Sequence, residues 1–166
     1  HVLAEGSMQQ VQQNEQVILS SYSADLASAM NRDVQRIITG ETYRALFPDT
    51  RLSEGKDTGV VRNNSRFDII DSNGYLISAG VGGGITGAGA TVGIIDDPVK
   101  NSAEADSATY RNTAWEWYTT TFKTRFEPNA IEIVCATRWH EDDLTGRILK
   151  QIEDGESGVK TEIVNL

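Results

Sequence analysis

The sequence predicts an α/β fold, in which a mostly parallel sheet is flanked by helices and carries an antiparallel hairpin as an insertion. Strands covered on both faces are typically short apolar runs, and three such runs lie within Gln16–Ser21, Thr91–Pro98 and Ala130–Ala136. Between them, apolar residues recur at helical spacing, which indicates amphipathic helices connecting parallel strands. An Asn-Gly pair at positions 73–74 separates two further apolar runs and indicates a hairpin.

Length and composition are those of an ordinary globular domain. The 166 residues are enough for one hydrophobic core, and 39% apolar with 23% charged content is unlike a disordered chain. No apolar run reaches the ~20 residues of a membrane span, and no secretory signal opens the chain. A net charge of −9 argues against a free-standing nucleic-acid binder, which usually carries a basic face. The single cysteine, Cys135, excludes an internal disulfide, and its apolar surroundings predict a buried core thiol in a reducing cytoplasm.

The first part of the chain predicts one strand and two helices. A polar segment, His1–Gln16, precedes the first strand, and its residues 6–8 resemble a cloning remnant. After that strand, Ser23 is expected to cap an amphipathic helix, which Gly40 ends at a C′ position. Glu41–Phe47 predicts a second, short helix.

The middle of the chain predicts a loop, a hairpin and a glycine-rich loop. A short strand is expected at Gly59–Arg62 within the polar stretch. The hairpin should pair Phe67–Ile70 with Tyr75–Ser78 across the Asn-Gly turn. The glycine-rich stretch Gly80–Gly89 permits close backbone approach, but an acid-ended strand follows it rather than a helix. It therefore does not match a dinucleotide-binding fingerprint.

The last part of the chain predicts a linker, two helices and two strands. Lys100–Ala108 is expected to be a polar linker. Tyr110–Arg125 predicts a helix whose aromatic stripe packs in the core rather than stacking on bases. A turn at 128–129 should lead into the third apolar strand. Apolar spacing predicts a helix over Leu144–Gly155, and Lys160–Val164 predicts a last strand.

Two acids, Asp96 and Asp97, follow the central apolar run, and Pro98 stops that strand because it has no N–H to donate. Open α/β sheets bind ligands at the C-terminal ends of their strands. Since successive strand side chains point to opposite faces, one acid can hold Mg²⁺ while the other orients or deprotonates a water. The alternative is a plain Asp-Asp-Pro turn after a core strand.

A second polar cluster follows the third strand. Thr137 and Arg138 should face the same crevice as the acids, because adjacent strands lie about 5 Å apart. The Thr137 hydroxyl could then sense what is bound there, or the pair simply caps the next helix. His140–Asp143 suggests a metal site, but a helix N-cap with acids in its first turn explains it better. A two-metal nuclease would need a distant third acid. Asp68 and Asp71 are available, but the hairpin geometry gives no reason to place them at that edge.

Several stretches together closely resemble the ATPase domain of the large terminase subunit of tailed bacteriophages and prophages. They are GVGGGITGAGATVGIIDDPVKNSAEADSATYR, WEWYTTTFKTRF and ATRWHEDDLTGRIL. In addition, ILSSYSADLASAMNRDVQRII with YRALFPDTRL resembles the segment after that family's Walker A helix. The resemblance extends over Val17–Leu149, nearly the whole chain.

That resemblance implies an ATP-driven motor that packages viral DNA, built on the additional-strand P-loop NTPase fold. By the matching motifs, Asp96 corresponds to the Walker B metal-binding acid and Asp97 to the catalytic carboxylate. Thr137 matches the coupling motif, and Arg138 belongs to the same signature. For the intact protein the family implies Mg²⁺ and ATP as cofactors. Its implied partners are double-stranded DNA, the small terminase subunit and the portal, in the cytoplasm of the bacterial host.

The sequence also departs from that family. The Walker A strand and its Gly-Lys-Ser/Thr loop are absent, so they are expected upstream of His1. Ala88 and Thr91 stand where family members often carry an arginine and an acid. No room remains after Leu166 for the nuclease domain. The chain is therefore expected to be a fragment, with a polar segment over residues 1–16 and a partial ATPase domain over 17–166.

Three expectations follow for such a fragment. It should be inactive alone and hold neither Mg²⁺ nor ATP tightly, since the missing loop supplies much of phosphate binding. Whether the chain is an enzyme stays open: it could instead be a non-catalytic scaffold on a degenerate NTPase fold, or a metal-dependent nuclease using Asp96 and Asp97. Without the Walker A strand, the edge of Ile131–Ala136 should self-associate or pair with the N-terminal segment HVLAE.

Overall fold

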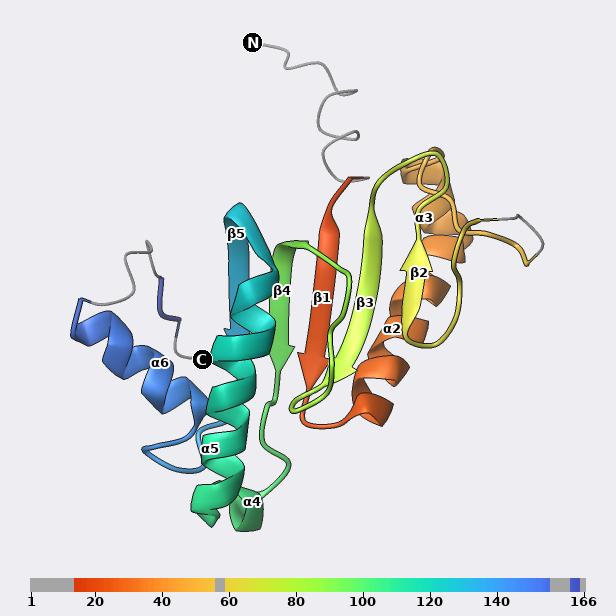
Figure 1. The fold of residues 1–166 in the computed structure, drawn as a ribbon. Helices are drawn as coiled ribbons and strands as arrows, with labels where there is room; N and C mark the ends of the chain where they lie inside the picture. The colour runs from red at the N-terminus through yellow and green to blue at the C-terminus, as the bar shows by residue number, and fades with distance from the viewer. Residues whose placement is uncertain (1–13, 56–58, 156–161, 165–166) are drawn as a thin grey trace.

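The protein forms a five-stranded sheet with helices on both faces (Figure 1). The computed structural model describes residues 14–55, 59–155 and 162–164. The strands lie in the order β2-β3-β1-β4-β5. Within the described residues, all neighbouring strands are parallel except β2 and β3. The strands are Gln16–Ser21 (β1), Arg66–Asp68 (β2), Tyr75–Gly80 (β3), Ala90–Asp96 (β4) and Phe126–Cys135 (β5). The predicted α/β class, with its antiparallel pair, is confirmed.

The helices divide between the two faces of the sheet. In Figure 1, α2 and α3 lie on one side, whereas α5 crosses the other side near β4 and β5. Alternation along β1 builds both cores: Ile18 packs with the α5 side and Leu19 with the α2 side. None of the described helices has the length and apolar content that crossing a membrane requires. The helices are Ala24–Thr39 (α2), Glu41–Leu46 (α3), Ser102–Asp106 (α4), Ala108–Trp117 (α5) and Leu144–Glu153 (α6).

The strand–helix unit β1–α2 follows the prediction at its start and departs from it at its end. The Ser23 hydroxyl caps α2 by accepting a hydrogen bond from the Leu26 N–H at 3.2 Å. Gly40 ends the helix, but with φ −70° rather than the left-handed conformation expected of a C′ glycine. Its N–H still satisfies a carbonyl of the last turn, that of Ile37 at 3.0 Å.

The predicted hairpin is confirmed, with Phe67 opposite Leu76, but β2 is only three residues long. Ile69 leaves the pairing and forms an isolated bridge with Leu52. The strand expected at Gly59–Arg62 is likewise reduced to a single bridge, between Arg62 and Phe67. Pairing of so few residues leaves this edge of the sheet short.

The segment expected to be a linker at 100–108 contains the helix α4, which the Asn101 side chain caps by accepting from the Glu104 N–H at 3.0 Å. The next helix is α5, and it continues as a π-helical turn, Tyr118–Phe122, and a 3₁₀ turn, Lys123–Arg125. The aromatic residues of this stretch are core residues, as predicted: Phe122 is fully buried and Trp117 nearly so. They pack against Ile18 and Ile95 of the sheet.

The strand β5 lies at the edge of the sheet and is exposed on one face, contrary to the prediction of a strand buried on both faces. Ile131 is 60% exposed and Ile133 is 48% exposed, because α2 packs on β1 and β3 rather than on β5. Cys135 shares that face and is exposed, so the predicted core thiol is wrong. The turn expected at 128–129 is an irregularity inside β5, where Asn129 has φ 67°.

The predicted last strand, Lys160–Val164, lies partly outside the described residues, and Glu162–Val164 are not in a strand. The expected pairing of β5 with the N-terminal HVLAE segment also lies outside the described residues.

Candidate functional site

The two acids lie at the C-terminal edge of the sheet, where β4 ends. Asp96 is opposite Ser21 of β1 and Cys135 of β5. Asp97 has a left-handed backbone with φ 43°, a conformation uncommon outside glycine. Its N–H donates to the Cys135 carbonyl at 2.9 Å, and its own carbonyl accepts from the Tyr22 N–H at 3.1 Å. The Asp97 backbone is therefore hydrogen-bonded on both sides, to the end of β5 and to the residue after β1. These bonds fix the position of its Cα and Cβ atoms.

The Asp97 carboxylate meets the segment that follows β5. One of its oxygens accepts a hydrogen bond from the Thr137 main-chain N–H at 3.1 Å. This contact confirms that the two strand ends converge, as the parallel arrangement predicts. The donor is the main-chain N–H of Thr137, whereas the sequence interpretation relied on its hydroxyl. The catalytic and metal-binding roles assigned to Asp96, Asp97 and Thr137 stay predictions.

Cys135 lies beside Asp96 at the end of the neighbouring strand. This residue was not predicted to be part of the site, because its apolar surroundings indicate a buried core thiol. Desolvation raises the pKa of the Cys135 thiol, and the negative charges of Asp96 and Asp97 raise it further. Alternation along the strand puts Cys135 on the same face as Ile131 and Ile133, opposite Val134, but the sequence does not show that helices leave this face uncovered.

The donor set fits a hydrated magnesium ion better than an all-protein metal site. Among the described residues, no group of three or more His, Cys, Asp or Glu side chains could hold a metal. Mg²⁺ commonly uses one or two carboxylates and completes its shell with waters and phosphate oxygens. Asp96 supplies one such carboxylate, and the buried Ser21 hydroxyl opposite Asp96 has no hydrogen-bond partner among the described residues.

Two of the acids in His140–Asp143 support a helix: Asp143 caps α6 and Asp142 anchors it through an ion pair. Asp143 is the N-cap of α6 and accepts from the Gly146 N–H at 2.8 Å, which confirms the capping interpretation for this residue. The prediction of acids in the first turn of this helix is wrong, because the first turn contains no acid and Asp142 precedes the N-cap. Arg138 turns back on the same loop, and its Nε donates to the Asp143 carboxylate at 3.1 Å. The Arg138 side chain is therefore part of the support of the α6 N-terminus in this structure.

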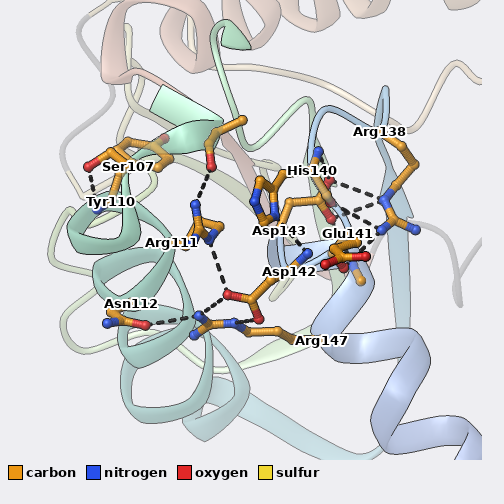
Figure 2. A network of polar contacts seen from close by, with 12 residues as sticks. Ser107, Tyr110, Arg111, Asn112, Arg138, His140, Glu141, Asp142, Asp143 and Arg147 are labelled. Carbon is orange, nitrogen blue, oxygen red and sulfur yellow. Dashed lines mark hydrogen bonds and ion pairs between the residues drawn. The ribbon is translucent and has the colours of Figure 1, made fainter. Parts of the chain in front are cut away.

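Asp142 forms an ion-pair network that ties the loop to two helices (Figure 2). Arg147 of α6 donates to both its oxygens, at 2.8 and 2.7 Å, and Arg111 of α5 donates to one at 3.1 Å. The hydrogen bond from Arg147 is the main cause that lowers the pKa of Asp142 to about 2, with Arg111 adding to it. Sequence reasoning missed both arginines. A cation in the first turn of α6 opposes the helix dipole, and such a misplaced charge signals an acidic partner nearby.

The acids proposed for a nuclease lie elsewhere. Asp68 pairs with Arg66 at 2.7 Å, and Asp71 pairs with Arg51 at 2.9 Å. Asp68 is opposite Tyr75, the first residue of β3, at the other end of the sheet from the β4 acids. The hairpin therefore does not bring a third acid to the candidate site.

Ala88 and Thr91, the two residues that differ from the family's usual ones, lie away from the acids. Ala88 is buried, at 8% exposure, in the glycine-rich loop that packs on the core. The Trp117 indole N–H fastens this loop by donating to the Gly83 carbonyl at 2.7 Å. Thr91 lies near the N-terminal end of β4, where its hydroxyl contacts Glu15 and accepts from the Gln16 N–H at 2.9 Å.

Comparison with known proteins places this geometry in a family. A search among curated proteins finds no match. The family model of the terminase large subunit, T4-like-virus type, N-terminal region, matches residues 1–164. The match takes in the strand that ends in the paired acids, the loop of Thr137 and the clamped helix α6. The chain therefore belongs to the family of N-terminal domains of terminase large subunits of the T4-like-virus type.

Proposed function

We propose that this chain is part of the ATP-hydrolysing motor domain of a phage DNA-packaging terminase. Membership of the terminase large-subunit family gives it a DNA-packaging role. The observation that carries the hydrolytic assignment is the contact between the Asp97 carboxylate and the Thr137 N–H. It joins an acid and a candidate sensing segment at the edge where open α/β sheets bind ligands.

In this proposal the chain's own residues divide the work. Asp96 holds Mg²⁺ of the bound nucleotide, and that ion supplies neutralisation of the phosphate charge. Asp97 orients the attacking water with the lone pairs that Thr137 leaves free. Thr137 follows any shift of the Asp97 carboxylate because the two are directly hydrogen-bonded. Arg138 acts through the loop, since its guanidinium is engaged with Asp143.

A manganese titration followed by NMR tests the assignment of Asp96. Paramagnetic Mn²⁺ replaces Mg²⁺ and broadens nearby amide signals even when binding is weak. We expect the amides of Asp96, Asp97 and Thr137 to broaden first, at lower Mn²⁺ when ATP is present. The substitution Asp96→Ala should remove this selectivity. Broadening that begins elsewhere, or that ignores the substitution, would contradict the proposal.

The 166 residues contain no Gly-Lys-Ser/Thr sequence, and the backbone cradle of such a loop supplies much of phosphate binding. We therefore expect the chain alone to turn over ATP negligibly and to bind it weakly. A coupled-enzyme assay of phosphate release measures this directly. Steady turnover that disappears in Asp96→Ala would show that the chain holds the phosphates by other means.

The proposed setting is the cytoplasm of an infected bacterial host, with double-stranded DNA, the small terminase subunit and the portal as partners. The exposed edge of β5 further suggests self-association of this chain. Its apolar outer residues Ile131 and Ile133 lie on an edge strand, and such edges recruit further strands. Sedimentation velocity at rising concentration should show dimers, which Ile133→Lys should weaken. A monomer at all concentrations would refute the self-association.

A further inference from the structure

The loop between β5 and α6, residues 136–143, carries two candidate site residues but few apolar contacts. Thr137, Arg138 and Trp139 are all exposed, and Trp139 is 46% exposed. The first fully buried apolar residue after β5 is Leu144, at 1% exposure. The position of this loop over the sheet edge therefore depends on polar contacts.

Asp143 organises the loop internally. Its carboxylate accepts from the main-chain N–H groups of Trp139 and His140, both at 3.3 Å, and from the Arg138 Nε. These partners all belong to the loop itself. Asp143 thus shapes the loop and caps α6, but it does not attach the loop to the rest of the domain.

Asp142 provides that attachment. Its two guanidinium partners are themselves anchored: Arg111 donates to the Ala105 carbonyl at 2.6 Å and is 12% exposed, and Arg147 donates to Asn112 of α5 at 2.9 Å. Figure 2 shows the Asp142 carboxylate pointing away from the loop, between these two arginines. The loop is therefore held at one end by Asp142 and at the other by the Thr137–Asp97 contact.

We propose that Asp142 is a positioning residue, which holds the Thr137 N–H against the Asp97 carboxylate by fixing the loop to α5 and α6. Its value for hydrolysis rests on the proposed function, whereas the positioning itself does not. An ion pair that leaves Asp142 46% exposed adds little to global stability. Loss of the pair should therefore release the loop without unfolding the sheet.

Amide hydrogen exchange of the ¹⁵N-labelled 166-residue chain tests this directly. In Asp142→Asn we expect the Thr137 amide to exchange at least tenfold faster, while the amides of β4 keep their rates. Asp142→Glu, which retains the charge, should restore much of the protection. The matched control is Asp33→Asn, which removes an exposed ion pair with Arg36 on α2, away from the loop. It should leave the Thr137 rate unchanged.

A coupling measurement separates positioning from a general structural effect. In Asp97→Asn the Thr137 contact is weakened already, so adding Asp142→Asn should change the Thr137 rate much less than it does in the unsubstituted chain. If Asp142→Asn does not fold, Arg147→Gln removes the two hydrogen bonds that join Asp142 to α6 and leaves only the one from Arg111. Asp33→Asn serves as the control for that variant too, because its ion pair with Arg36 lies outside this network.

Two results would overturn the inference. A Thr137 rate within twofold of the original in Asp142→Asn would mean that other contacts hold the loop. An equal rise in β4 exchange would mean that Asp142 stabilises the whole domain. Neither depends on nucleotide or metal, so the manganese titration can fail while this inference stands, and the reverse.

Discussion

Gly93 in β4 is where an added methyl group meets the tightest packing of the sheet. A Cβ at Gly93 would lie 2.4 Å from both Cε1 and Cζ of Phe126 and 2.8 Å from Cζ of Phe122. Carbon atoms in contact are about 3.5–4.0 Å apart, so the nearest ring would have to move by about 1 Å. Phe122 is fully buried, and its ring packs edge-to-face against that of Phe126 with the ring centroids 5.1 Å apart. This packing leaves little room for such a shift.

The expected effect of Gly93→Ala on stability follows from two opposing terms. Overpacking a core costs about 1–3 kcal/mol. Replacing glycine by alanine stabilises the fold by about 0.4–1 kcal/mol, because it lowers the conformational entropy of the unfolded chain. Since two aromatic rings are involved, we expect a value near the upper end, a net loss of about 1.5–2.5 kcal/mol in the free energy of unfolding.

Urea unfolding followed by tryptophan fluorescence measures this loss as a lower midpoint at unchanged slope. Gly84→Ala is the matched control, because a Cβ there meets nothing within 4 Å. Trimming the ring with Phe126→Leu should recover part of the loss when combined with Gly93→Ala. A Gly93→Ala protein within about 0.5 kcal/mol of the original, the usual range of surface substitutions, would refute the packing argument.

Three further outcomes are expected. Phe122→Ala should lower the free energy of unfolding by about 3–5 kcal/mol, measured by the same urea titration, because it empties a fully buried site. The lowered pKa of Asp142, about 2, means that its ion pair stabilises the fold above the unfolded pKa, near 4, and is lost as the pH falls toward 2. Acid titrations should therefore show a flatter fall in stability for Asp142→Asn, by less than about 1 kcal/mol since the pair is exposed. Finally, the raised pKa of Cys135 predicts slower labelling by a disulfide reagent at pH 7 than that of free cysteine, and faster labelling in Asp96→Asn.

Local patterns in the sequence were sufficient to predict the interior of the fold. The apolar runs of β1 and β4 and the capped helix α2 came out as predicted, since strand burial and N-capping are local properties. The exposure of Ile131 and Ile133 could not be predicted in this way. A strand at the edge of a parallel sheet has the same β-branched composition as a central one, and what distinguishes them is which faces the helices cover.

The candidate site likewise contains one contact that the sequence could predict and others that it could not. The meeting of Asp97 with Thr137 follows from a general rule about the ends of parallel strands, so sequence alone could predict it. The attachment of Asp142 to Arg111 joins residues 31 positions apart on separate elements, and no local pattern specifies that pairing. The identity of the donor, the main-chain N–H of Thr137 rather than its hydroxyl, was not predicted either. It occurs next to the left-handed backbone of Asp97, with φ 43°, which no local pattern in the sequence indicates.

The position of β5 has a consequence for how the sheet can grow. The opposite edge is the three-residue β2, with the charged residues Arg66 and Asp68, so that side offers little for a further strand. Extension is thus directional, toward β5. A strand added there in parallel would end beside Thr137, and the paired acids would then be enclosed near the middle of a wider sheet. Any chain that extends this sheet would therefore cover the exposed edge of β5, and the candidate site would then lie at an interface between two chains.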